Sequence, residues 1–315
     1  MILSCGDALI DFVPAKTAHG RDALMPAVGG SCLNVAVGLA RLGAPTGFVG
    51  GVSTDLWGSM IADHAAASDV DLRYATRDDD QTTLAFVRIV AGESHYAFYD
   101  AATAARNWIY PRGRIPFATI DAVHVGSTTL VHDQGAKETL AMIADASRTA
   151  TISFDPNCRP NLVKDRDAYR TRMDGFAASA DMIKMSDVDF DYLHGHDRYA
   201  ERAETLLAAG RDLFVVTRGA SGALAWHRSA GAVEVAAPAV IVVDTIGAGD
   251  SFQAALLFAL HRLGRLAKAG LPHLTQLELR RALSFAASCA AVTCTRPGAD
   301  PPLWAEMAAT WDALA

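Results

Sequence analysis

The sequence lacks several features that would place it among disulfide-rich, nucleic-acid-binding or membrane proteins. Its five cysteines contain no C-x-x-C pair, which argues against a disulfide framework or a zinc site and indicates a reducing compartment. The net charge of −7 gives no basic excess for a nucleic acid or a membrane surface. The most apolar stretch, residues 282–293, is too short to cross a bilayer, and the amino end lacks the basic region of a signal peptide. We therefore expect a cytoplasmic protein without nucleic-acid or membrane partners.

Several catalytic motifs are also missing. There is no G-x-x-x-x-G-K-[ST] loop, no His-Arg-Asp triplet, no G-x-S-x-G turn and no H-E-x-x-H pair. The first expected strand is followed by a single glycine, Gly6, rather than by G-x-G-x-x-G. The sequence therefore does not support a P-loop ATPase, a protein kinase, a hydrolase-fold esterase, a zinc peptidase or a Rossmann dehydrogenase.

Short apolar runs alternate with helical patterns along the chain, half of which is hydrophobic. This alternation predicts an α/β fold with a mostly parallel central sheet covered by helices on both faces. No low-complexity linker interrupts it, so we expect one domain over residues 1–315. The expected strands are residues 2–5, 47–49, 122–125, 151–154, 182–183, 214–217 and 240–243. The expected helices are residues 33–42, 56–67, 134–147, 168–178 and 200–209.

A second, smaller sheet is expected beside the main one. Residues 82–90 and 95–99 are rich in β-forming side chains, and Ala91-Gly92-Glu93-Ser94 between them suggests the turn of a hairpin. Together with the chain near the amino end, this hairpin would form a β lid from about residues 12–24 and 82–106. A lid suits phosphoryl transfer because its closure excludes water, which would otherwise accept the phosphoryl group.

The segment DTIGAGDSF, from Asp244 to Phe252, carries the strongest chemical signal. It lies between the expected strand at 240–243 and an apolar helical stretch that begins near Ser251. Its two glycines let the backbone approach a ligand, and the start of a helix offers free N–H groups to an anion. Phosphoryl transfer would use both that anion site and an aspartate, with Asp250 taking the proton of the accepting hydroxyl. An ordinary helix cap is the alternative for Asp250.

Three further segments offer ligand-binding groups. Asp11 follows the first strand, where ligands bind in open α/β sheets, and could accept hydrogen bonds from sugar hydroxyls unless it is a solvated loop residue. Gly29 and Gly30 permit a close backbone approach, with Asn34 on the first turn of the next helix, although an ordinary loop explains them as well. Arg159 suits a phosphate or a carboxylate, or else a surface salt bridge.

Taken together, these segments resemble the ribokinase-like (PfkB) family of carbohydrate kinases over nearly the whole chain. The segment from Gly29 to Asn34 is similar to the amino-terminal signature of that family, and DTIGAGD is similar to its carboxyl-terminal signature. GDALIDF (6–12), YAFY (96–99) and DPNCRP (155–160) resemble the fructokinase branch, and 2-keto-3-deoxygluconate kinases share much of this pattern. The resemblance implies an ATP-dependent sugar kinase that phosphorylates a primary hydroxyl, most simply of fructose.

The resemblance also implies roles for individual residues. The catalytic base would be Asp250, and the anion hole for the moving phosphoryl group would be Ile246, Gly247, Ala248 and Gly249. The sugar would be bound by Asp11, Gly29, Gly30, Asn34, Phe98 and Arg159. The nucleotide would be bound by Thr217, Gly219, Gly222 and Ser186, with adenine near residues 287–291 and the turn Pro297-Gly298.

ATP and magnesium are the cofactors that the resemblance implies. The family often carries Asn-x-x-Glu near its magnesium site, whereas this chain offers Ser186 and Asp189. Asp189 could still hold metal-bound waters, because magnesium keeps several of its waters in proteins. Potassium bound by backbone carbonyls near Asp244 and Ile246 is a further implication. A homodimer is plausible because lid sheets with an exposed apolar face often find a partner.

Three other functions remain open. A 2-keto-3-deoxygluconate kinase would use Arg159 for its substrate carboxylate. A ribokinase or nucleoside kinase would share the same catalytic turn. A catalytically silent sugar-binding regulator on the same fold is the alternative from another class, although the intact Asp250 turn argues against it.

Overall fold

A computed structural model describes residues 1–90 and 93–314 and shows a main sheet in the order β14-β13-β12-β11-β10-β9-β1-β4. The six strands from β4 to β12 in this order run parallel, and β13 and β14 extend one edge as antiparallel strands. The predicted mostly parallel sheet is confirmed. Its strands are β1 (Ile2–Cys5), β4 (Thr46–Val49), β9 (Ala122–Gly126), β10 (Thr151–Asp155), β11 (Met182–Ser186), β12 (Leu213–Thr217), β13 (Ala223–His227) and β14 (Gly231–Val235).

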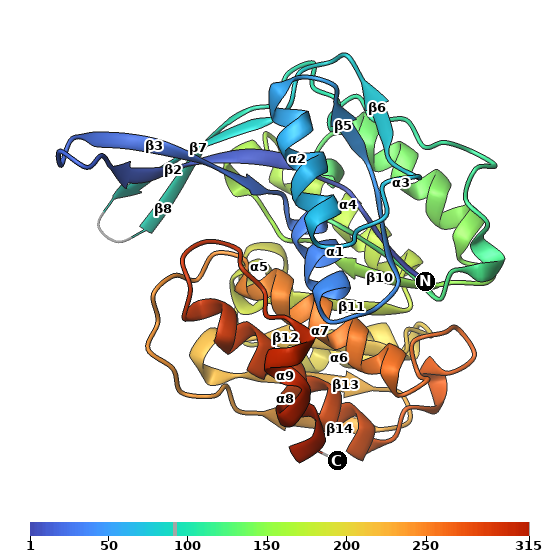
Figure 1. Ribbon diagram of the computed structural model, residues 1–315. Helices are drawn as coiled ribbons and strands as arrows, with labels where there is room; N and C mark the ends of the chain where they lie inside the picture. The colour runs from blue at the N-terminus through green and yellow to red at the C-terminus, as the bar shows by residue number, and fades with distance from the viewer. Residues whose placement is uncertain (91–92, 315) are drawn as a thin grey trace.

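Helices cover both faces of this sheet, as the sequence predicts (Figure 1). The neighbours Ile2 and Leu3 are both fully buried but belong to different cores, because successive side chains of a strand point to opposite faces. Strands buried on both faces have continuous apolar sequences rather than alternating ones. One core includes α1 (Ser31–Arg41), α7 (Ala248–Arg262), α8 (Gln276–Cys294) and α9 (Trp304–Ala313). The other includes α3 (Asp133–Ala146), α4 (Arg166–Ser179), α5 (Asp187–His194) and α6 (Tyr199–Ala208).

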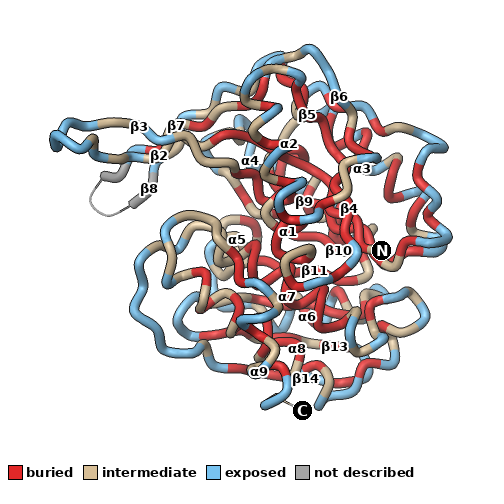
Figure 2. Tube along the Cα trace, in the orientation of Figure 1, coloured by how far each residue is buried: buried red, intermediate tan, exposed pale blue. Residues whose placement is uncertain are grey.

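A smaller sheet in the order β3-β2-β7-β8 projects from the body (Figure 1). Its hairpin of β2 and β3 ends in an exposed tip (Figure 2). We call this sheet the lid. The predicted turn residues Ala91 and Gly92 lie outside the described part of the chain. The strands of the lid are β2 (Leu9–Lys16), β3 (Asp22–Gly29), β7 (Leu84–Val90) and β8 (Glu93–Tyr99).

The remaining elements are short or peripheral. Helix α2 (Leu56–Ala67) packs beside α1, and Asp55 caps it by accepting a hydrogen bond from the N–H of Gly58 at 2.7 Å. Within the described chain, no helix combines the length and apolar character that crossing a bilayer requires. The other elements are β5 (Gly51–Ser53), β6 (Thr76–Asp78) and the 3-10 turns Phe117–Thr119, Ser127–Leu130, Pro160–Leu162, Gly219–Ser221 and Leu271–His273.

The strand predicted at residues 240–243 was wrong. This apolar run lies on the surface, and Ile241 in its middle is 88% exposed. The N–H of Val243 donates to the carbonyl of Cys294, at the end of α8, at 2.8 Å rather than to a neighbouring strand. An apolar run forms a buried strand only where both faces can be covered, and here the chain is leaving the sheet edge to reach α7.

Candidate active site

A cleft of about 740 Å³ lies between the lid, the amino end of α7 and loops that follow strands of the main sheet. Parallel strands place their carboxyl ends at one edge, so side chains from distant parts of the sequence converge there. The cleft brings together most of the residues predicted to hold the sugar and the phosphoryl group. Those that line it are Asp11, Gly30, Asn34, Phe98, Arg159, Ile246, Gly247, Gly249 and Asp250.

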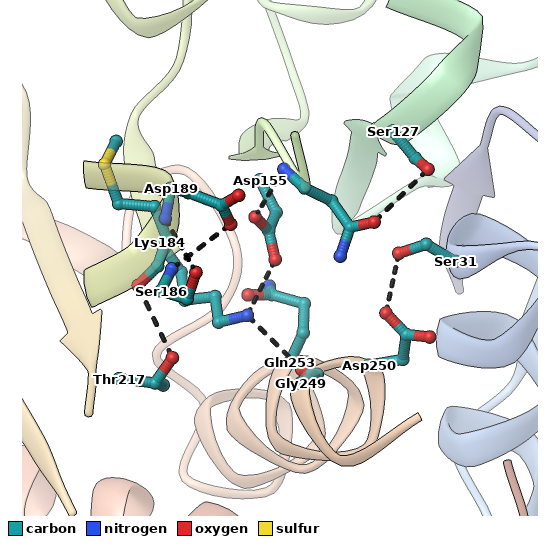
Figure 3. Close-up of polar contacts among 12 residues, drawn as sticks. Ser31, Ser127, Asp155, Lys184, Ser186, Asp189, Thr217, Gly249, Asp250 and Gln253 are labelled. Carbon is teal, nitrogen blue, oxygen red and sulfur yellow. Dashed lines mark hydrogen bonds and ion pairs between the residues drawn. The ribbon is translucent and has the colours of Figure 1, made fainter. Parts of the chain in front are cut away.

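Asp250 lies in the first turn of α7 with its carboxylate hydrogen-bonded to α1 (Figure 3). One oxygen accepts from Ser31 Oγ at 2.6 Å and the other from Asn34 Nδ2 at 2.9 Å. Burial raises the pKa of the Asp250 carboxyl above its usual range, and these two hydrogen bonds and the charge of Lys184 oppose that rise. The N-cap of α7 is Gly247, so Asp250 is not the helix cap that the sequence left open.

The turn before α7 depends on Gly247. Its φ of 74° lies in the left-handed region, and a Cβ atom there would come within 2.6 Å of the Cβ of Ala299. No side chain in the described chain caps this end of α7. The N–H of Ala248 donates to the carbonyl of Thr245 at 3.2 Å, so it is engaged within the turn. The remaining first-turn N–H groups and the helix dipole make this end of α7 suited to an anion.

Asp11 on β2 is the carboxylate on the lid side of the cleft. Burial raises its pKa to about 7, although the charge of Arg159 opposes the shift. Gly29 leaves room for it, because a Cβ atom there would lie 2.2 Å from Asp11 Oδ2. Gly30 has a φ of 104°, and a Cβ atom there would lie 2.6 Å from the carbonyl oxygen of Asp7. The two glycines therefore let the chain turn tightly into α1 beneath the cleft.

The other side of the cleft joins the lid to the loop after β10. The side chain of Arg159 folds back, and its Nη1 donates to the carbonyls of Asn157 and Cys158, each at 3.0 Å. Asn161 Nδ2 donates to the carbonyl of Tyr96 at 2.9 Å and so links this loop to the lid. Arg159 is half-buried and lines the cleft, which does not fit the surface salt bridge that the sequence left open.

The predicted nucleotide residues lie along the same edge of the main sheet. Ser186 ends β11 directly beside Thr217, which ends β12 (Figure 3). Gly219 and Gly222 have φ values of 50° and 84°, and a Cβ atom on Gly222 would lie 2.0 Å from the carbonyl of Val235. The tight turn from β12 to β13 therefore needs Gly222. None of these four predicted nucleotide residues is among the described residues that line the cleft.

Ser186 and Asp189 form a capping box at the start of α5. The Asp189 N–H donates to Ser186 Oγ at 3.0 Å, and Asp189 Oδ1 accepts from the N–H of Cys158 at 2.9 Å. Asp244 acts similarly at the next turn, where its carboxylate accepts from the N–H groups of Ile246 at 3.0 Å and Gly298 at 2.8 Å. Each predicted metal-site carboxylate thus also fixes a loop at the cleft edge.

A family model described as pfkB family carbohydrate kinase matches residues 1–306. The chain belongs to this family. It is 36% identical over 282 residues to a fructokinase of Rhizobium leguminosarum bv. trifolii, covering 89% of this chain and 86% of the relative. It is 33% identical over 297 residues to a fructokinase of Klebsiella pneumoniae, covering 93% of each.

Solved structures of the pfkB family agree with the ribokinase-like fold of the chain. A fructokinase from Xylella fastidiosa with bound ATP superimposes with a TM-score of 0.88 at 29% identity, covering 99% of this chain and 98% of that one. A fructokinase double mutant from Vibrio cholerae O395, with fructose, ADP and potassium ion bound, gives a TM-score of 0.81 at 25% identity and covers 95% and 93%. The predicted class, an ATP-dependent carbohydrate kinase, is confirmed.

Three residues of this carbohydrate kinase site escaped the sequence analysis as site residues. Asp7 is buried and accepts hydrogen bonds from the N–H of Cys32 at 3.0 Å and from Ser127 Oγ at 2.8 Å, which ties the first strand to its neighbours. Ser31 donates a hydrogen bond to Asp250, and Lys184 lies beneath the turn before α7, where its Nζ donates to the carbonyl of Gly249. A signal existed for Lys184, since a lysine inside the apolar strand β11 indicates a buried charge that needs a partner.

Proposed function

We propose that this carbohydrate kinase transfers the γ-phosphoryl group of ATP to a primary hydroxyl of fructose. The observation that carries the proposal is the position of Asp250, buried against Ser31 and Asn34 in the first turn of α7. The fructokinases among its relatives favour fructose as the sugar. The groups offered for binding the sugar are Asp11, Gly29, Gly30, Asn34, Phe98 and Arg159.

The sugar would lie between the lid and the body. Asp11 accepts hydrogen bonds from hydroxyl groups, and Asn34 still has an N–H and a carbonyl oxygen to offer beside its bond to Asp250. Phe98, which stacks on Tyr96 with ring centroids 5.9 Å apart, supplies an apolar face of the lid against the sugar ring. Arg159 uses Nη1 to donate to two backbone carbonyls, and its other N–H groups can bind a further oxygen of the substrates.

Asp250 takes the proton of the primary hydroxyl as that oxygen attacks the γ-phosphorus of ATP. In the turn formed by Gly247, Ala248 and Gly249, with Ile246 before it, the N–H groups of Gly247 and Gly249 would face the moving phosphoryl group, because those of Ile246 and Ala248 donate within the turn. Their fixed orientation at the positive end of the α7 dipole stabilises the negative charge of the transition state. Thr217, Gly219, Gly222 and Ser186 line the side on which the rest of the nucleotide would lie.

The residues around the cleft suit a divalent cation. Among the described residues, the carboxyl groups of Asp7, Asp11 and Asp250 line the cleft together with Arg159. Among the described residues no three acidic, histidine or cysteine side chains gather as a complete ligand set, so magnesium would keep most of its waters, with Asp189 accepting from one of them. Magnesium, when bound, neutralises phosphate charge. For potassium, we propose the backbone carbonyls near Asp244 and Ile246, where Asp244 holds the turn in shape.

The exposed run 240–243 supports a place for the adenine base. Val240, Ile241, Val242 and Val243 form an apolar surface beside the end of α8, close to Pro297-Gly298. Burying such a surface against a flat aromatic base removes it from water. We therefore propose that adenine lies against the exposed side of this run, beside the end of α8 and the expected residues 287–291.

The first test is ADP release from MgATP, coupled to a spectrophotometric assay, with fructose, 2-keto-3-deoxygluconate, ribose, adenosine, glucose and mannose. Turnover with fructose far above the rest supports the proposal. A preference for the keto-acid would move Arg159 to a carboxylate-binding role and contradict fructose. Binding of a sugar without turnover of any would favour the silent regulator.

The role of Asp250 has its own test. Asp250→Asn keeps the shape and a hydrogen-bonding group toward Ser31, so we expect fructose to bind with little change. Turnover should fall by about 10²- to 10⁴-fold because the general base is lost. Isothermal titration with fructose and the coupled assay measure the two quantities, with Asp133→Asn on the exposed start of α3 as the control. An active Asp250→Asn enzyme would refute Asp250 as the base.

Two properties of the whole protein complete the proposal. The five cysteines are free thiols, which fits the reducing cytoplasm, where ATP is also supplied. We also propose a homodimer in which a second copy of the chain covers the lid face that points away from the cleft. That face carries Leu24 and Tyr99, which are 47% and 64% exposed.

A further inference from the structure

Lys184 lies inside the main sheet, under the catalytic turn, and is only 2% exposed. Its Nζ donates to Asp155 Oδ2 at 2.7 Å and to the carbonyl oxygen of Gly249 at 3.4 Å (Figure 3). Lys184 is not among the residues that line the cleft in the described chain. A buried charge is costly, so an ammonium group at this depth must be held by partners. Asp155 explains why Lys184 can stay charged but not why its Nζ reaches toward Gly249.

The Gly249 carbonyl belongs to the same peptide group as the N–H of Asp250. In a helix the N–H groups point toward the amino end, so in α7 this N–H faces the side where the anion would lie. A positive charge at the carbonyl end of a peptide group polarises it and makes the opposite N–H a stronger donor. The charge of Lys184 is thus placed to polarise a donor of the turn before α7, although Lys184 is outside the described lining of the cleft.

Lys184 also influences the carboxylate of Asp250. Its charge opposes the burial that raises the pKa of Asp250, and it does so alongside Arg159 and the hydrogen bonds from Ser31 and Asn34. The acidic groups around Lys184 itself are Asp155, Asp189 and Asp250, and His124 on β9 also interacts with its charge. The other ionisable groups that interact with Asp250 are Asp11 from β2, Cys32 from α1, Tyr96 from β8 and Arg159 from the loop after β10.

We propose that Lys184 is a positioning residue for phosphoryl transfer: it holds the Gly249–Asp250 peptide group in its donor orientation and keeps Asp250 ready to accept a proton. This inference rests on the proposed kinase function. It differs from simple charge neutralisation, in which Lys184 would only compensate the buried carboxylate of Asp155. The two roles predict different results when both members of the ion pair are replaced.

The test compares Lys184→Met, Asp155→Asn and the double variant Lys184→Met/Asp155→Asn with the unaltered enzyme. We expect Lys184→Met to lower kcat by about 10- to 100-fold, less than the loss of a donor that touches the transition state. The KM for fructose should change little because Lys184 does not line the cleft. The acidic limb of the kcat profile should move to higher pH, because Asp250 must lose its proton to act and its pKa rises without the nearby positive charge.

The double variant removes the unpaired carboxylate that could prevent Lys184→Met from folding. We expect it to unfold cooperatively while keeping the low kcat and the shifted pH limb. Lys268→Met is the matched control, since Lys268 pairs with Asp181 at 2.9 Å, just before the opposite end of β11. It should keep the kcat and pH profile of the unaltered enzyme.

Two results would overturn the inference. Recovery of kcat in the double variant would show that Lys184 only neutralises Asp155, and an unchanged kcat and pH profile in Lys184→Met would show that it has no positioning role. Either result leaves the proposed function intact if the unaltered enzyme phosphorylates fructose. An unaltered enzyme that phosphorylates no sugar would instead contradict the proposed function, and this inference with it.

Discussion

The carboxyl group of Asp11, for which we propose a role in binding the sugar, also has a cost to stability. Burial raises its pKa to about 7, above the value of about 3.9 that an unfolded aspartate has. Between about pH 4 and pH 7, the folded protein therefore keeps a proton on Asp11, whereas the unfolded chain has lost it. Stability linked to this proton is present below about pH 4 and is lost as the pH rises to about 7. A carboxylate that destabilises the fold when it is charged is expected where it binds a ligand.

We predict that Asp11→Asn is more stable than the unaltered protein at pH 8 but binds fructose poorly. The amide needs no charge in the buried site, so the melting temperature should rise by about 1 to 3 °C at pH 8, and the difference should shrink toward pH 5. The KM for fructose should increase at least tenfold. Differential scanning calorimetry at the two pH values and the coupled assay give these quantities.

Asp22→Asn on the exposed end of the lid hairpin is the control for this prediction, since its side chain is 91% exposed. It should change neither the pH dependence of stability nor the KM. A melting temperature of Asp11→Asn below that of the unaltered protein at pH 8 would contradict a costly charge at Asp11.

At the residue scale, the sequence predicted the groups that sit in short local patterns and missed those defined by distant contacts. Asp250 stands out within nine residues of sequence, and Asp11 follows the first strand. Ser31, which binds Asp250, lies 219 residues away from it in the chain. Only the folded sheet, which brings α1 and α7 together, makes them partners, so no spacing rule could have paired them.

The amino end of α7 is an element whose function depends on its backbone. Gly247 has a φ of 74°, and Gly264, just beyond the other end of the helix, has a φ of 68°. An alanine in this region costs about 1 to 2 kcal/mol because its Cβ crowds the backbone. Around Gly264 a Cβ atom would meet nothing within 4 Å, whereas at Gly247 it would lie 2.6 Å from Ala299 Cβ. An alanine at Gly264 therefore tests backbone strain alone, whereas an alanine at Gly247 adds crowding against Ala299.

We predict that Gly264→Ala loses about 1 to 2 kcal/mol of unfolding free energy and keeps its kcat. Gly247→Ala should lose more stability, and its kcat should fall because the crowded turn moves the N–H groups from the phosphoryl site. Urea unfolding and the coupled assay provide the comparison. Equal kcat values for the two variants would mean that the turn before α7 does not serve the reaction.

At the element scale, the sequence predicted the bounds of helices and strands closely where burial determines the secondary structure. The helix at residues 56–67 and the strand at residues 2–5 have their predicted bounds. The run 240–243 has the same apolar composition but lies exposed on the surface. Hydrophobicity alone shows that a segment avoids water and not what covers it. We therefore interpret the exposed run as a surface that a ligand could cover.

At the scale of the whole molecule, the two faces of the lid have different surroundings. Asp11 and Phe98 line the cleft, and strand pairing places both on the same face through Ala85. Because side chains alternate along strands, Phe12 and Tyr99 point to the opposite face. The sequence predicted a lid and its general position. It could not show that both of its faces carry apolar side chains, since that depends on the register of four strands.

We predict that the protein is a dimer in solution and that Leu24→Glu makes it monomeric. Leu24 pairs with Pro14 on β2 and lines a groove of about 970 Å³ on the lid. A glutamate there would have to bury its charge against the second copy, which costs more free energy than the lost apolar contact. Size-exclusion chromatography with light scattering measures the mass. Leu277→Glu, at a position 73% exposed on α8, should stay dimeric, whereas a monomeric unaltered protein would refute the lid interface.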